Sequence, residues 1–220
     1  MKNNLSYIYG VSHVVYSTDE LEESMNLFVD VGYGLKGKKE HSSNAPEKEA
    51  FLSGPMAETS DMILMSNDIF PDIEVKKENR ISDLKTSSNY DYYVNYKGNT
   101  IGEFPAILKD LDMVAVTDSF NLFVQCQDPE KATALWKLFG MSVTTISDNL
   151  VLLTVGNLLS KKKTNIFYLR SNKVLSSWLD QSNVVCLSFL CSDIASTRYA
   201  LAEMKYRVGD MFNISPFRKD

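Results

Sequence analysis

Residues 11–34 read VSHVVYSTDELEESMNLFVDVGYG, and this stretch decides the fold. Its first part is rich in Val and Tyr, which favours a strand. The Ser-Thr-Asp sequence at 17–19 then offers N-cap side chains for a helix. Apolar residues follow at helical spacing, at Leu21, Met25, Phe28 and Val29. Gly32 is placed to end this helix and Gly34 to begin a second strand, so the stretch predicts strand, helix and strand in succession.

The same order of elements returns twice along the chain. At 121–141 a strand is followed by Asp128-Pro129-Glu130, which combines an N-cap, a proline at the first helical position and an early acid. At 184–209 the order returns less regularly, with an apolar strand and then a helix. We therefore predict an α+β fold of repeated β-α-β-β-β modules, with curled sheets that are mixed but mostly antiparallel.

The repeats divide the chain into a first module at 1–67, a connector at 68–117, and a second module with a shortened third module at 118–220. In the first module we expect a loop over 37–49 and closing strands over 49–54 and 61–67. In the connector we expect a hairpin near 90–99 and an extended segment over 108–116. The third module has no room for its last strands, so its open edge is expected to be covered by a homodimer or by strands from the connector.

Composition narrows the class of protein. The chain has 220 residues, a net charge of −5 and a pI of about 5.2, which disfavours a nucleic-acid partner because phosphates call for a basic face. Its three cysteines lie in apolar strands without metal-binding spacing, as expected of reduced thiols. No apolar run approaches the roughly 18 residues of a membrane span, and the N-terminal residues do not resemble a signal peptide. We expect a cytoplasmic protein without a membrane partner.

The segments VSHVVYSTDELEESMNLFVDVGYGL and EAFLSGPMAETSDMILMSN resemble the opening and the closing strands of a module in the vicinal oxygen chelate superfamily. That superfamily includes glyoxalase I, the bleomycin and fosfomycin resistance proteins and the extradiol dioxygenases. The resemblance implies that paired modules enclose a cleft with a divalent metal. The ligands would come from the first strand of a module, often His, and from its last strand, often Glu.

Carried onto this sequence, the resemblance places His13 at the first-strand ligand position, six residues before Asp19. The other ligand positions that it implies fall on apolar residues: Leu64, Leu122, Phe167 and Leu187. Apolar side chains cannot bind a metal, and a lone His is too few for a catalytic site, which typically has three protein ligands. We therefore expect no metal and no other cofactor, and an apolar pocket lined by these five residues.

Three functions follow from this interpretation. The first is a glyoxalase-like or bleomycin-resistance-like protein that binds an apolar or aromatic small molecule without a metal. The second is a metal-dependent lyase, isomerase or dioxygenase of the same superfamily, with ligands at other positions; Glu58 and Asp61, near the closing strand, are the candidates. The third is a structural or regulatory relative in which side chains fill the cleft.

Overall fold

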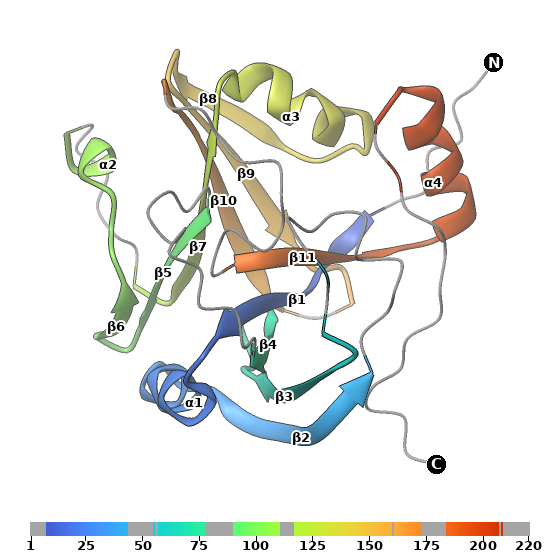
Figure 1. Ribbon diagram of the computed structural model, residues 1–220. Coiled ribbons are helices and arrows are strands. Elements are labelled where there is room, and N and C mark those ends of the chain that lie inside the picture. The colour runs from blue at the N-terminus through green and yellow to red at the C-terminus, as the bar shows by residue number, and fades with distance from the viewer. Residues whose placement is uncertain are drawn as a thin grey trace.

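The computed structural model describes residues 8–43, 55, 57–77, 90–110, 117–159, 161–172, 184–206 and 208 (Figure 1). These residues form two mixed β-sheets with four helices. The expected α+β class and the mixed, mostly antiparallel sheets are confirmed. None of the described helices is long and apolar enough to cross a membrane.

Sheet A has five strands in the order β11-β1-β4-β3-β2. Strands β1 and β4 are parallel, and every other pairing is antiparallel. Helix α1 connects β1 to β2. The elements are β1 (Ile8–Thr18), α1 (Leu21–Asp30), β2 (Gly34–Ser43), β3 (Thr59–Ser66), β4 (Asp72–Lys77) and, from the third repeat, β11 (Val184–Cys191) followed by α4 (Ile194–Glu203).

Sheet B has six strands in the order β6-β5-β7-β10-β9-β8, again with one parallel pair, β7 and β10. Helix α3 connects β7 to β8, so sheet B repeats the strand-helix-three-strand order of sheet A. The elements are β5 (Tyr90–Tyr96), β6 (Asn99–Gly102), α2 (Ala106–Asp110), β7 (Ser119–Cys126), α3 (Pro129–Leu138), β8 (Val143–Ser147), β9 (Leu150–Gly156) and β10 (Lys163–Arg170).

The main core lies between the two sheets. Each sheet contributes one apolar face, and α1 adds Phe28, which is 1% exposed. Aromatic pairs join the two halves, with ring centroids 6.1 Å apart for Phe70 and Phe120 and 5.5 Å apart for Tyr16 and Tyr92. Because side chains alternate along a strand, each sheet also has a second face that points away from this core. The second face of sheet A is polar and carries the candidate site, whereas that of sheet B is apolar.

The turn between β9 and β10 fastens sheet B to the start of β1. The backbone N–H of Leu158 donates to the carbonyl of Tyr9 at 2.7 Å, and Asn157 Nδ2 donates to the carbonyl of Val11 at 3.3 Å. Gly10 permits this approach, because a Cβ at this position would lie 2.6 Å from the Cα of Asn157. Its φ of +149° is also one that other residues rarely adopt.

Three expectations differ from the structure. Residues 37–43 were expected in a loop but extend β2, where they pair with β3. The segment 61–67, expected to close the first module, lies in β3, and the closing strand is β4, inside the expected connector. Leu108 was expected in an extended segment but is buried in α2. The hairpin near 90–99 is confirmed and pairs with β7, not with β11. The strand expected at 49–54 lies outside the described residues.

Candidate functional site

His13 lies in the middle of β1 on the second face of sheet A. Its neighbours across the strand pairings are Asp72 on β4 and Ser188 on β11. The Oγ of Ser188 shares a 2.9 Å hydrogen bond with His13 Nε2, and the Oγ of Ser12 lies 3.3 Å from Nδ1. Both ring nitrogens therefore have a hydroxyl partner, and β11 of the third repeat takes part in the site.

Glu74 on β4 completes this polar cluster. It pairs with Val15, two residues along β1 from His13, so the two side chains share a face. Glu74 Oε2 lies 4.0 Å from His13 Nε2, and the side chains are 12% and 31% exposed respectively. Ser188, His13 and Glu74 thus bring a hydroxyl, an imidazole and a carboxylate together from three strands.

The five residues predicted to line one pocket lie in different places. Leu64 on β3 pairs directly with Glu74, so Leu64 and His13 share the second face of sheet A. Leu122 is in the main core, and Leu187 packs against that core from β11. Phe167 lies on the second face of sheet B, in a separate buried cluster. The structure therefore brings His13 and Leu64 together and separates them from the other three.

Leu122 and Leu187 were assigned by counting six residues back from the residue that caps the following helix. The structure shows that this count is one residue short. His13 lies seven residues before Glu20, the residue that precedes the first turn of α1. Seven residues before Asp128 and Asp193, the N-caps of α3 and α4, stand Asn121 and Cys186. The pairing agrees for sheet B, because Asn121 lies opposite Asn165 on β10 as His13 lies opposite Asp72 on β4.

Glu74 is the site residue that the sequence prediction missed. It stands in the closing strand of the first module, where the resemblance implies Glu, and Phe167 holds the matching position in β10 two residues after Asn165. A sequence signal was available: in DIEVKK the apolar residues Ile73 and Val75 alternate with charged ones, which is typical of a strand with one buried face.

The second face of sheet B is covered by apolar side chains, unlike the polar second face of sheet A. Phe167 stacks on Phe123 with centroids 5.5 Å apart, and Leu108 of α2 covers them and is fully buried. Asn121 and Asn165 stand at the positions that match His13 and Asp72 in sheet A. The side-chain amide of Asn165 donates a 3.0 Å hydrogen bond to that of Asn121. This face is a second small core, in which Asn121, Asn165 and Phe167 stand in place of His13, Asp72 and Glu74.

Asp72 forms an ion cluster at the start of β4, next to His13. It accepts hydrogen bonds from Ser66 Oγ at 2.7 Å and from Lys36 Nζ at 3.0 Å, and it pairs with Lys162 from the turn between β9 and β10. Burial by itself would raise the pKa of Asp72, but the hydrogen bonds from Lys162, Ser66 and Lys36 hold this pKa below its ordinary value. The cluster therefore contains a carboxylate that is ionised at neutral pH and links the two sheets.

A divalent metal does not fit the described residues of this site. His13 and Glu74 are two suitable ligands, but in the described part of the chain no group of three His, Cys, Asp or Glu side chains is placed to hold an ion. Two protein ligands fall short of the three that catalytic metal sites typically have.

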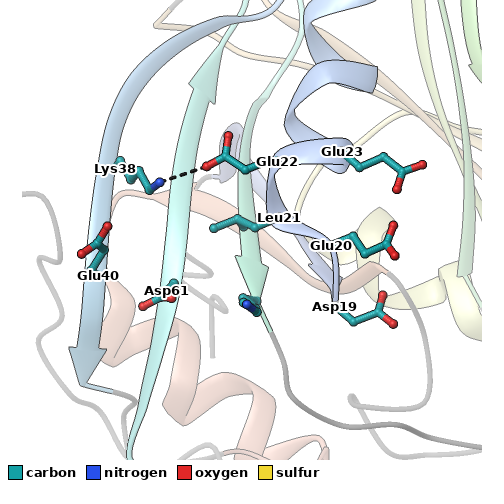
Figure 2. A pocket seen from close by; sticks show the side chains of 9 residues that line it. Asp19, Glu20, Leu21, Glu22, Glu23, Lys38, Glu40 and Asp61 are labelled. Atoms are coloured by element: carbon teal, nitrogen blue, oxygen red, sulfur yellow. Dashed lines mark hydrogen bonds and ion pairs between the residues drawn. The ribbon is translucent and has the colours of Figure 1, made fainter.

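Figure 2 shows a separate hollow of about 480 Å³ beside the start of α1. Lys38 Nζ donates to Glu22 Oε1 at 2.9 Å across it, and Leu21 points into it from the helix. Two lysines and six carboxylates line it, the latter being Asp19, Glu20, Glu22, Glu23, Glu40 and Asp61. The hollow is therefore strongly acidic, and it lies at the end of β1 beyond Thr18.

Comparison with solved structures identifies the architecture. Two mutant forms of glyoxalase I from Zea mays superpose with a TM-score of 0.52 each, at 10% and 9% sequence identity. The first alignment covers 91% of this chain and 80% of that one, and the second covers 88% and 81%. The fold is therefore glyoxalase-like. No protein-family model matches the sequence, and no curated protein matches it. At this identity the glyoxalase-like architecture is common to both proteins, and the chemistry of this chain has to come from its own residues.

Proposed function

We propose that this glyoxalase-like protein binds a small apolar or aromatic molecule through the second face of sheet A. The observation that supports the proposal is the meeting of Ser188, His13 and Glu74 beside Val15 and Leu64. A few convergent polar groups next to apolar side chains are typical of small-molecule sites, where the polar groups fix the orientation of the ligand.

The chemistry of the three polar groups limits the ligand. An ionised Glu74 only accepts hydrogen bonds, whereas Ser188 and the imidazole of His13 can both donate and accept. A ligand hydroxyl or N–H next to an aromatic ring could donate to Glu74 while the ring lies against Leu64. Phenols, naphthols and aromatic amides are the classes that match.

A thermal-unfolding screen against phenols, naphthols and aromatic amides tests this proposal. A stabilising compound should lose its effect in His13→Ala and in Ser188→Ala. It should keep its effect in His41→Ala, which removes a histidine whose side chain is 83% exposed. If no compound of these classes raises the melting temperature, or if His13→Ala binds as well as the wild type, the proposal is wrong.

A metal-dependent enzyme of the superfamily is the second candidate. It is favoured by one observation, that Glu74 stands on the closing strand 4.0 Å from His13, since the resemblance implies ligands from these two strands. Metal analysis of protein purified without chelator or affinity tag separates the candidates. A full equivalent of Ni, Zn, Mn or Fe that is lost in both His13→Ala and Glu74→Gln would favour the enzyme, and no stoichiometric metal would favour the metal-free site.

The homodimer expected from the sequence remains part of the proposal. Strand β11 is an end strand of sheet A among the described residues, and its sequence VVCLSFLC is apolar and uncharged. Such an edge can pair with a second chain. Light scattering at micromolar concentration should give twice the mass of 24.9 kDa, and a strict monomer would contradict this expectation.

A further inference from the structure

The turn between β9 and β10 displays two leucines to solvent. Leu158 and Leu159 are 76% and 71% exposed, the highest values among the large apolar side chains of the described chain. Isolated exposed leucines are common, but two adjacent ones at the tip of a hairpin form a convex apolar point. They play no part in either core or in the polar cluster on sheet A.

The turn is held rigidly in this position. The N–H of Leu158 donates to the Tyr9 carbonyl at 2.7 Å, and the N–H of Leu159 donates to Asn157 Oδ1 at 2.8 Å. The N–H of Asn157 donates to the Lys162 carbonyl at 2.9 Å, and Gly10 provides the space for Asn157. Because these hydrogen bonds already order the backbone at Asn157, Leu158 and Leu159, covering the two leucines costs less conformational entropy than ordering a free loop would.

Lysines follow the two leucines in the same turn. Lys161 and Lys163 lie beside the apolar tip and are exposed. The ion cluster of Lys36, Lys162 and Asp72 adjoins it, and Asp68 lies beside Ile69, whose carbonyl accepts from Lys163 N–H. Lys36 and Lys162 are paired with Asp72, so Lys161 and Lys163 supply the positive charge that the tip presents to solvent.

The acidic hollow lies at the other end of sheet A. The turn contacts Tyr9 and Val11 at the start of β1, whereas the acidic hollow begins beyond Thr18 at its end. The ten residues of strand between them span about 30 Å, well over the Debye length of about 8 Å at physiological salt. The six carboxylates of the hollow therefore do little to repel an anionic surface that meets the tip.

We propose that the described part of this turn, 157–159 and 161–163, is a peripheral membrane contact, in which Leu158 and Leu159 enter the interface of an anionic bilayer and the lysines lie at the headgroups. A convex apolar tip with basic flanks suits a bilayer surface, where apolar insertion and attraction to anionic lipids act together. The contact needs no membrane-spanning segment. It is independent of the small-molecule function proposed above.

Sedimentation of the full chain with vesicles tests this proposal. Phosphatidylcholine vesicles containing phosphatidylserine should bind the wild type, pure phosphatidylcholine vesicles should bind it more weakly, and added NaCl should reduce binding to the former. The double variant Leu158→Ser/Leu159→Ser should lower the partition coefficient by about tenfold. The matched control Leu27→Ser/Leu138→Ser removes two other exposed leucines, 41% and 49% exposed, and should bind like the wild type.

Two outcomes would overturn the membrane contact. One is an absence of wild-type binding to phosphatidylserine vesicles, which would leave the tip to a protein partner or to no partner. The other is equal binding by the two double variants, which would mean that the leucines of the turn do not take part. Circular dichroism of each variant confirms that a loss of binding is not a loss of fold.

Discussion

Truncation of Phe167 tests whether this residue lines a ligand pocket or fills a core. Phe167 is 5% exposed, stacks on Phe123 and is covered by Leu108. Removing a buried aromatic ring costs about 3–5 kcal/mol, because apolar contacts are lost and a cavity remains. We therefore expect Phe167→Ala to lower the free energy of unfolding by that amount, a large part of the roughly 5–15 kcal/mol of a typical domain.

Leu64→Ala is the comparison within sheet A. Leu64 is only half-buried on its face, so its truncation should cost about 1–2 kcal/mol, less than the roughly 2–5 kcal/mol of a fully buried leucine. Urea unfolding followed by circular dichroism gives both values by linear extrapolation. Phe167→Leu, a smaller change, serves if the alanine variant does not fold. A cost for Phe167→Ala below that for Leu64→Ala would contradict the assignment of Phe167 to a core.

Three further predictions concern stability. Gly10→Ala should cost about 1–3 kcal/mol more than Gly140→Ala: both glycines have positive φ, but only at Gly10 would the new Cβ meet Asn157. Equal costs in urea unfolding would refute the close approach. The folded-state pKa of Asp72 is lowered, so its contribution to stability is present above its ordinary pKa and is lost as the pH falls below it. Asp72→Asn should therefore flatten the acid limb of a pH titration of stability, and an unchanged limb would contradict the ion cluster. Thr133→Val should cost about 1 kcal/mol, because the Thr133 hydroxyl is fully buried and donates to a helix carbonyl at 2.7 Å; a neutral result by thermal unfolding would show that this hydrogen bond contributes nothing.

Local signals predicted α3 and α4 well, whereas α2 was expected to be extended and α1 begins after Glu20, whose side chain forms no cap. Asp128 caps α3 by accepting from Lys131 N–H at 3.1 Å, and Pro129 occupies the first turn, as the sequence indicated. Asp193 caps α4 in the same way. Capping depends on residues within one turn, so it can be inferred from sequence without knowledge of the rest of the chain.

The site was harder to predict because it depends on register and on which strand closes the module. A bulge between Val11 and His13 shifts the pairing of β1 with β11, and a shift of one residue moves a side chain to the other face. The closing strand β4 follows a loop in which Phe70 is buried. The apolar residues of this loop show neither helical nor strand spacing, so the sequence did not indicate that a strand follows it. The sequence prediction thus paired His13 with Leu64, whereas the structure places Glu74 beside His13. Leu64 and Glu74 are neighbours across β3 and β4.

The division between the two sheets also depends on tertiary contacts. Leu122 and Phe167 are both apolar residues in strands, and composition does not distinguish them. In the structure they lie on opposite faces of sheet B, because Leu122 meets the main core and Phe167 meets Leu108 of α2. Helix α2 belongs to the expected connector. The repeat pattern alone did not predict that this segment would cover sheet B.

The central claim, that ligand binding takes place at His13, has one direct test. The chain contains only two histidines, so a long-range ¹H–¹⁵N spectrum of the imidazole rings has two sets of signals, which His41→Ala assigns. Addition of the most stabilising compound of the thermal screen should shift the signals of His13 and leave those of His41 in place. Saturable binding that leaves the His13 signals unchanged would contradict the account.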